Sequence, residues 1–375
     1  MSAFHCAIDV KGLDRKGLDR GVKVRVLEDG RSPLVRRSRS QLPGFGLAVA
    51  LTTFAALAVV GSLSSVGQAA ARGVASARTV SGPPYPSALI VKSELRLKAN
   101  LVRDKLSRPP RLVFLGGSRS QRFDPAFARK RTGLSAVNLS LSCARPEAAW
   151  AYVNWLYKRS PGTRLRCIWG VQSGMMRDRD LDAALLQARR FYRYFPDELL
   201  ASQRRLLPSS KAEMPKYYGF LRNRYSNRGL LIRNVYDVRR ARGYTLKQSL
   251  DHYIEKMLRG RRAEAPIYTS RASSYFEQTL EFLNAHGTRP VIVLMPVHPR
   301  VLAVMRRHGM GGEREKFRSY LAGLEAEYDI KVLDFTKISS FNGSRDWFYD
   351  GVHVTRRNAN RIITAVRAMA GEYVK

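Results

Sequence analysis

The chain has 375 residues, and its 66 Lys and Arg against 30 Asp and Glu give a formal net charge of +36 at pH 7. Hydrophobic residues make up 45% of the sequence, which is enough to fill a core, so the chain is not disordered as a whole. Only three Cys are present, which excludes a disulfide-rich scaffold, and no pair of them has zinc-site spacing. The charge favours an anionic partner, of which nucleic acid is one class.

The first 43 residues form a basic, polar leader. It contains the tandem repeat KGLDR-KGLDR at residues 11–20 and lacks apolar periodicity. We predict that residues 1–43 are cytoplasmic and disordered, because such a sequence buries too little apolar surface to fold.

An uncharged and mostly apolar segment follows at residues 44–66. About 20 apolar residues span a bilayer as a helix, so the sequence predicts a transmembrane signal anchor here. The basic residues Arg36, Arg37 and Arg39 keep the leader inside, which puts the rest of the chain on the outer side of the cytoplasmic (inner) membrane. A signal peptide cleaved near Ala71 and a buried soluble helix are the alternatives.

Residues 67–100 have the Gly, Pro and Ser content of a linker, and residues 101–375 are predicted to form one domain. In this domain short apolar runs alternate with segments of helical periodicity. This alternation implies a parallel sheet covered on both faces, and hence a three-layer α/β fold. The predicted strands are residues 112–115, 136–139, 167–169, 291–294 and 331–333. The predicted helices are residues 146–157, 270–285, 313–328 and 355–370, with Thr355 capping the last one and Asp124 capping a further one.

Residues 177–268 interrupt the alternation. They contain no good strand run, and residues 181–195 and 245–258 are amphipathic. Residues 177–262 alone carry 21 Lys and Arg against 9 Asp and Glu. We interpret the interval as a helical insertion that caps the carboxyl ends of the strands, where ligands of such sheets bind.

Two short motifs carry reactive groups. Ser118 follows Gly116 and Gly117 directly after the first predicted strand, where glycines allow a close approach, although Gly-Gly-Ser is also a common turn sequence. Asp350 and His353 form an Asp-x-x-His pair just before the last predicted helix. This spacing lets the carboxylate hold one imidazole nitrogen, which is what a general base for a serine nucleophile needs. A single His at this position is also a common capping or surface residue.

Taken together, the two motifs resemble the SGNH (GDSL-like) hydrolase and acyltransferase superfamily. The similarity covers about residues 111–370 and rests on three blocks, residues 115–120, 137–142 and 348–353. They look like the membrane-anchored branch that includes proteins of polysaccharide O-acetylation and teichoic-acid D-alanylation. The resemblance implies a flavodoxin-like SGNH fold with Ser118 as the nucleophile, His353 as the base and Asp350 as its orienting acid.

The resemblance also implies an oxyanion hole, with one donor from the backbone N–H of Ser118 or Arg119. The second block of the family usually offers a Gly N–H, and the nearest residues here are Ser142 and Cys143. The third block usually offers an Asn, and here Gln172 stands in its place. These departures change two of the expected donors, and loss of one donor typically costs about 10²–10³ in rate.

Three further positions have open alternatives. His298 follows the fourth predicted strand, so it would either contact substrate at the rim of the site or be a loop His held by packing. Cys143 and Cys167 lie near predicted strands in an oxidising location, so they would either pair or leave Cys167 as an ordinary core residue. The sequence has no metal-ligand cluster and no dinucleotide or phosphate-loop motif, and we expect no cofactor and no metal.

Two functions follow from these features. The first is a membrane-anchored serine acyltransferase or esterase that acts on an extracytoplasmic glycan or envelope polymer through an acyl-enzyme at Ser118. An anionic polymer is the expected acceptor, and the resemblance implies a multi-spanning membrane acyltransferase as the acyl donor. The alternative is a non-catalytic SGNH-fold subunit that binds an anionic polymer in an envelope assembly or modification complex. Nucleic acid is not an expected partner, because no recognition signature is present.

Overall fold

The computed structural model describes residues 109–142, 144–177, 189–204, 223–259, 268 and 270–375, together with six residues between positions 94 and 103. The leader, the predicted anchor at residues 44–66 and most of the predicted linker lie outside the described residues. Within the described part of the chain, no helix has the length and apolar character needed to cross a bilayer.

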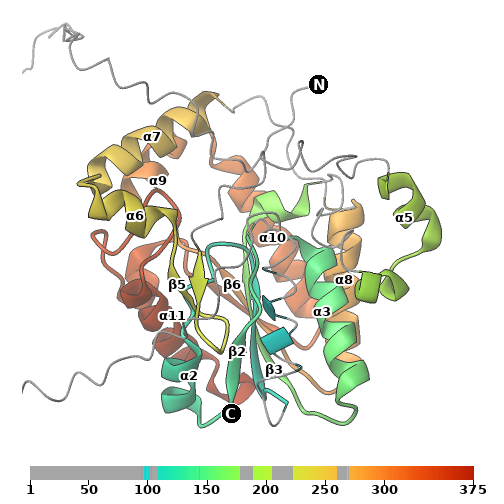
Figure 1. Ribbon diagram of the computed structural model, residues 1–375. Coiled ribbons are helices and arrows are strands. Elements are labelled where there is room, and N and C mark those ends of the chain that lie inside the picture. Colours follow the sequence, from blue (N-terminus) through green and yellow to red (C-terminus); the bar gives the residue numbers. More distant parts are fainter. Residues whose placement is uncertain are drawn as a thin grey trace, which may run out of the picture. The chain divides into compact units, whose positions relative to one another are not determined.

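A five-stranded parallel sheet forms the centre of the domain and confirms the α/β class (Figure 1). Except for the last strand, the strands are almost fully buried, as strands between two helical layers must be. The third strand is longer than predicted, because it includes Arg166 at its half-buried start and Gly170 and Val171 at its end. In spatial order the strands are β2 (Ala136–Asn138), β1 (Leu112–Gly116), β3 (Arg166–Val171), β6 (Val291–Leu294) and β7 (Lys331–Asp334).

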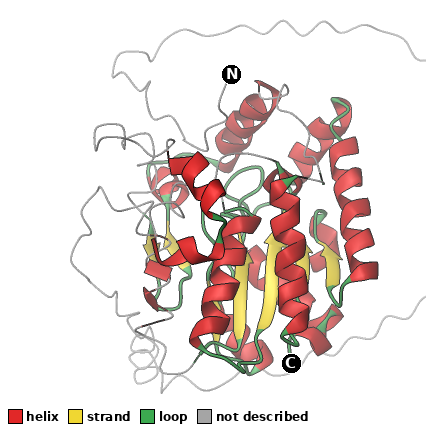
Figure 2. Ribbon diagram, turned by 90° about the vertical axis from the view of Figure 1, so that its right-hand side faces the viewer, coloured by secondary structure: helices red, strands yellow, loops and turns green. Residues whose placement is uncertain are grey.

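Helices cover both faces of the sheet, so the domain has the three predicted layers (Figure 2). Alternate residues of β1 enter two separate cores, with Val113 and Leu115 in one and Leu112 and Phe114 in the other. The first core includes residues of α3 (Pro146–Arg159), α8 (Arg271–Ala285) and α10 (Gly312–Glu327). The second includes residues of α2 (Pro125–Thr132) and α11 (Arg356–Met369).

The helix boundaries agree with the sequence within one or two residues. Asp124 caps α2 as predicted, because its side chain accepts the N–H of Ala126 at 2.9 Å. Thr355 occupies the predicted N-cap position of α11, but its hydroxyl makes no capping hydrogen bond, and nothing in the structure explains this. The helix α9 (Pro299–Arg307), which begins after His298, was not predicted.

The insertion is not purely helical, which corrects the prediction. Its described part contains α5 (Asp197–Arg204), α6 (Val235–Ala241) and α7 (Leu246–Arg259), and also an antiparallel pair, β4 (Arg224–Tyr225) and β5 (Leu231–Arg233). Strands of two and three residues are too short to show the alternation of apolar and polar residues by which a strand is predicted from sequence. The helix predicted at residues 245–258 is confirmed by α7. Of the other amphipathic piece, residues 181–188 lie outside the described residues and residues 189–194 form a 3₁₀ helix.

The strands β1 and β3 approach closely at Gly116 and Gly170, which are partners in the parallel register. Gly116 has a φ of 129°, which L side chains rarely adopt. An added Cβ at Gly116 would lie 2.4 Å from the carbonyl oxygen of Gly170. This approach fixes the start of the turn that carries Ser118.

We expect Gly116→Ala to lower the free energy of unfolding by about 2–4 kcal/mol, because it combines backbone strain with a clash against backbone atoms. Urea unfolding measures this change. Gly323→Ala in α10 is the control, because no atom lies within 4 Å of its added Cβ and Ala favours a helix. Equal effects at the two positions would contradict the close approach of the strands.

Candidate active site

Ser118 lies in the tight turn that follows β1. The N–H and the Oγ of Ser120 both donate to the carbonyl oxygen of Gly117, at 3.2 and 3.0 Å. The Ser118 side chain is half-buried. Neither its backbone N–H nor that of Arg119 donates a hydrogen bond to any residue in the described part of the chain. Free N–H groups beside a serine hydroxyl are what an oxyanion hole requires.

Asp350 and His353 lie in the loop between β7 and α11. The N–H of Tyr349 donates to the carbonyl oxygen of His353 at 2.7 Å, which closes the loop. Within the loop, Oδ1 of Asp350 accepts the backbone N–H groups of Val352 and His353, each at 2.8 Å. The Asp-x-x-His spacing therefore folds the backbone around the carboxylate and holds both side chains in place.

The structure brings Ser118, His353 and Asp350 together from distant parts of the sequence. Oγ of Ser118 lies 2.9 Å from Nε2 of His353, and Nδ1 of His353 lies 2.8 Å from Oδ2 of Asp350. With Nδ1–H donating to the carboxylate, Nε2 is left to accept the serine proton. In this arrangement an imidazole can act as general base for a serine nucleophile.

Asp350 is buried and yet ionised. Burial by itself raises its pKa, but the charge and hydrogen bond of His353, together with the two backbone N–H donors, outweigh burial and lower the pKa to about 2. An ionised carboxylate at this place can stabilise an imidazolium on His353.

Tyr236 of α6 also belongs to the site, although no sequence motif marks it. Its hydroxyl lies 3.2 Å from Nδ1 of His353, and the two ring centroids are 5.0 Å apart. Burial and the charge of Asp350 raise the pKa of Tyr236 well above its ordinary value, so the phenol keeps its proton and donates it toward the carboxylate. The only sequence signal for this residue was its place in a Tyr-rich insertion.

Tyr349 connects α6 to both reactive segments. Its hydroxyl donates to Oδ1 of Asp237 at 2.8 Å, and its ring stacks on that of Tyr236 at a centroid distance of 5.9 Å. Arg122, from the turn of Ser118, pairs with Asp237 at 2.5 Å and lies 4.8 Å from the centre of the Tyr349 ring. The insertion is therefore bound to the serine turn and to the histidine loop.

The other predicted oxyanion donors differ in their availability. The N–H of Ser142 donates to Oε2 of Glu94 at 3.1 Å, so it is not free to hold an oxyanion in this structure. Cys143 lies outside the described residues. Gly116 of β1 and Gly170 of β3 are paired in the parallel register, and Ser118 and Gln172 each follow two residues later. The two residues therefore lie beyond the ends of neighbouring strands. The amide oxygen of Gln172 is buried and has no partner among the described residues, and a flip of the amide would present its NH₂ there instead.

Glu94 and Lys98 belong to the folded domain, although the predicted linker extends to residue 100. Glu94 accepts hydrogen bonds from Gln121 and, at 2.5 Å, from the hydroxyl of Tyr225. Lys98 is fully buried, donates to the carbonyl oxygen of Ser140 and lies 4.9 Å from the centre of the Tyr225 ring. Burial lowers the pKa of Lys98 to about 8, against the opposing effect of Glu94. The domain therefore begins before residue 101.

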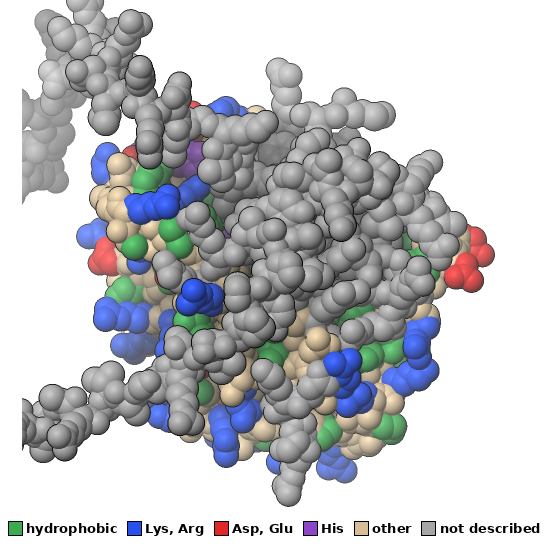
Figure 3. All heavy atoms as spheres, in the orientation of Figure 1, with side chains coloured by type: hydrophobic (Ala, Val, Ile, Leu, Met, Phe, Trp, Pro, Cys, Tyr) green, Lys and Arg blue, Asp and Glu red, His purple; other side chains and the backbone are tan. Residues whose placement is uncertain are grey.

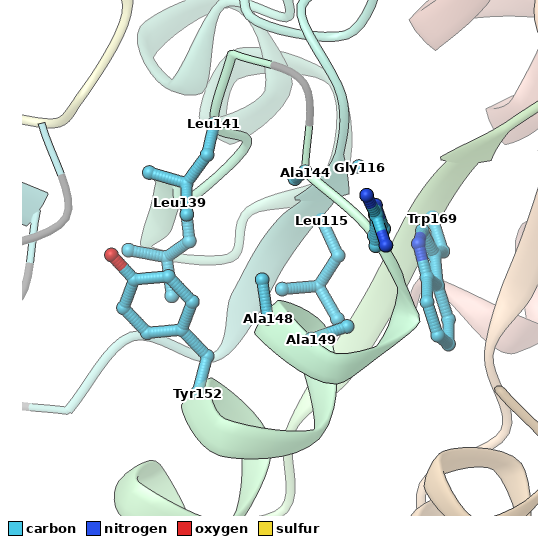
Figure 4. Close-up of a pocket in the computed structure, with 10 residues that line it drawn as sticks. Leu115, Gly116, Leu139, Leu141, Ala144, Ala148, Ala149, Tyr152 and Trp169 are labelled. Atoms are coloured by element: carbon cyan, nitrogen blue, oxygen red, sulfur yellow. The ribbon is translucent and has the colours of Figure 1, made fainter. Parts of the chain in front are cut away.

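A small, mainly apolar pocket lies beside the end of β1 (Figure 4). Its empty volume, which includes solvent at its mouth, is about 210 Å³. Leu115 and Gly116, just before Ser118, line it. The indole nitrogen of Trp169, also at the pocket, is buried without a hydrogen-bond partner among the described residues. Further lining residues are Ala144, Ala148, Ala149 and Tyr152.

The structure gives His298 and Cys167 structural roles. Nδ1 of His298 accepts the N–H of Arg300 at 3.1 Å and caps α9, and its buried ring packs on Phe348, so His298 is the packed loop His rather than a substrate contact. Cys167 is a free, buried thiol, as an ordinary core residue would be, and burial raises its pKa. Among the residues that the structure describes, no group of His, Cys, Asp or Glu side chains could hold a metal ion.

Comparisons of the chain with protein-family models and with curated proteins give no match. Among solved structures, the chain is similar to the crystal structure of a "putative acylhydrolase" from Bacteroides fragilis NCTC 9343. The sequence identity is 9% and the TM-score is 0.33, with 75% of this chain and 95% of that chain covered. A TM-score at this level does not establish a common fold.

Asp350→Asn should change the pH dependence of stability. The folded-state pKa of about 2 lies below the ordinary value of 3.8, so the carboxylate contributes about 2 kcal/mol to the unfolding free energy above about pH 4, and this contribution is lost as the pH falls toward 2. In urea unfolding, the stability difference between wild type and variant should shrink by that amount over this range. Asp346→Asn, at an exposed position in the same loop, is the control. A difference that does not vary with pH would contradict an ionised Asp350.

Tyr236→Phe should slow the reaction of Ser118 with a fluorophosphonate by about 3- to 10-fold, because the variant keeps the ring but loses the hydrogen bond that positions the Asp350–His353 pair. The labelling rate and the urea midpoint are both measured, since slower labelling at unchanged stability separates positioning from folding. Tyr244→Phe, just beyond α6, is the matched control. Equal labelling rates in the two variants would rule out the positioning role.

Proposed function

We propose that the chain is an SGNH-type serine esterase or acyltransferase that works through an acyl-enzyme at Ser118. The observation that carries this proposal is the hydrogen-bonded series of Ser118, His353 and Asp350, with distances of 2.9 and 2.8 Å. The resemblance of the sequence blocks around these residues to the SGNH superfamily supports the same conclusion.

In the first half of the reaction, Oγ of Ser118 attacks the carbonyl carbon of an ester while its proton passes to Nε2 of His353. The carbonyl oxygen becomes an oxyanion, for which the free N–H groups of Ser118 and Arg119 and the amide of Gln172 are the available donors. When the intermediate collapses, His353 returns the proton to the leaving alcohol, and the acyl group remains on Ser118.

In the second half, water or an acceptor hydroxyl gives its proton to His353 and attacks the acyl-enzyme, which releases an acid or a new ester and restores Ser118. Exclusion of water decides between the two outcomes. The rings of Tyr236 and Tyr253 pack against the loop of His353 and Gly351, which supports transfer over hydrolysis.

The acceptor in this proposal is an anionic glycan or envelope polymer outside the cytoplasmic membrane. The apolar segment at residues 44–66 serves as the anchor, and a multi-spanning membrane acyltransferase supplies the acyl group. The excess of Lys and Arg supports an anionic acceptor. Basic side chains are spread over the described part of the face seen in Figure 3, where few acidic ones are visible.

A second candidate function is a non-catalytic subunit that binds an anionic polymer in an envelope assembly or modification complex. The observation that favours it is the hydrogen bond from the N–H of Ser142 to Glu94, because it engages a donor that the family uses for the oxyanion. Under this hypothesis the fold is retained while the chemistry is lost.

Active-site labelling with a fluorophosphonate separates the two functions. The wild-type chain should be labelled and Ser118→Ala should not, because the reagent reacts with an activated serine. Ser120→Ala serves as a control for a serine of the same turn that does not contact His353. Equal labelling of wild type and Ser118→Ala would exclude catalysis at Ser118. Retention of the polymer by Ser118→Ala, with acylation in cells unchanged, would favour the binding subunit.

A further inference from the structure

Arg119 follows the proposed nucleophile directly, and its side chain makes no hydrogen bond to the described residues. It is half-buried in the turn after β1. No hydrogen bond or ion pair joins its guanidinium to any of the described residues. Arg122, three residues later in the same turn, is different, because it pairs with Asp237 and donates to the carbonyl oxygen of Ile232. The turn therefore contains one arginine that holds the structure together and one that does not.

The surroundings of Arg119 come from the histidine loop and from the two helices of the insertion. Its electrostatic neighbours are Tyr253 of α7, Asp350 and Tyr236 of α6. The loop and α7 are in close contact, because an added Cβ at Gly351 would lie 2.4 Å from Cδ1 of Tyr253. Burial lowers the pKa of Arg119, which these neighbours oppose, and an arginine stays cationic at neutral pH. A partly desolvated cation that makes no hydrogen bond is unfavourable, so an anion that reaches it gains more than it would in water.

We propose that Arg119 binds a carboxylate of the substrate, close to the ester bond that Ser118 attacks. The inference rests on the proposed function and deepens it, because it defines the substrate as an ester or acceptor with one negative charge near the reacting group. The planar guanidinium matches a carboxylate with two parallel hydrogen bonds. A single charge is favoured, because the ionised Asp350 nearby repels a second one.

A different role for Arg119 is to offset the charge of Asp350 without touching substrate. That role predicts a different pattern of activities. Asp350 acts in every turnover, so a change in its electrostatics affects charged and neutral esters alike. Recognition of a carboxylate affects only the esters that carry one.

The test uses the full-length chain and two matched pairs of esters. One pair places the charge on the leaving alcohol, para-acetoxybenzoate against the neutral para-acetoxybenzamide. The other pair places it on the acyl group, para-nitrophenyl glutarate against para-nitrophenyl valerate. The ratio of kcat/KM for the charged ester to that for its neutral partner is measured in wild type, Arg119→Gln and Arg119→Lys. Arg242→Gln, at an exposed position that ends α6, is the matched control.

We expect the ratio for one pair to fall by about 10- to 100-fold in Arg119→Gln, mainly through KM, and to be partly restored in Arg119→Lys. Arg242→Gln should leave both ratios unchanged. The pair that responds identifies whether the carboxylate belongs to the acyl group or to the alcohol. Unchanged ratios in Arg119 variants that still react with the neutral esters would overturn the inference and leave the proposed function standing. If the wild type reacts with no ester and Ser118 is not labelled, the proposed function fails, and the inference fails with it.

Discussion

The buried charge of Asp350 is the constraint on which the rest of the site depends. A carboxylate removed from water is unfavourable unless donors meet its charge. Two donors are backbone N–H groups of its own loop, and satisfying them bends the loop into the shape that presents His353. The third donor is Nδ1 of His353, which fixes the tautomer and directs Nε2 at Ser118. The phenol of Tyr236 adds a contact from outside the loop. The buried charge of Asp350 thus determines the conformation of its loop and the tautomer of His353. It also provides a contact that positions α6.

The insertion is consequently part of the geometry of the candidate site rather than a separate cover. Asp237 accepts from Tyr349 on the histidine loop and from Arg122 on the serine turn, so a single side chain of α6 holds both reactive segments. A displacement of α6 would release these contacts together with that of Tyr236. The relative position of Ser118 and His353 is therefore coupled to the fold of the insertion, although the two residues themselves belong to the core α/β domain.

Ser118, Asp350 and His353 could be predicted from the sequence because each lies at a visible boundary, the end of an apolar strand or the start of a helix. A parallel sheet gathers such boundaries at one edge. Tyr236 could not be predicted, because α6 has only seven residues and its placement depends on how the insertion folds back. Glu94 was missed for a related reason. Its contact with Tyr225, and the burial of Lys98 beside the same ring, depend on where the insertion places Tyr225. His298 follows its strand as predicted, but its role depends on the start of α9, which no sequence pattern indicates.

The charge of +36 and the proposed role of Arg119 act over different distances. Exposed cations attract any polyanion through a long-range field, which salt screens over about 8–10 Å under ordinary conditions. Such attraction concentrates a polymer at the surface but distinguishes poorly among its groups. A half-buried guanidinium beside Ser118 acts only on an anion that has entered the site, where screening is weak and geometry is fixed. Selectivity for a charged substrate should therefore survive at ionic strengths that abolish capture of the polymer, because the selective interaction is the one that the fold removes from water.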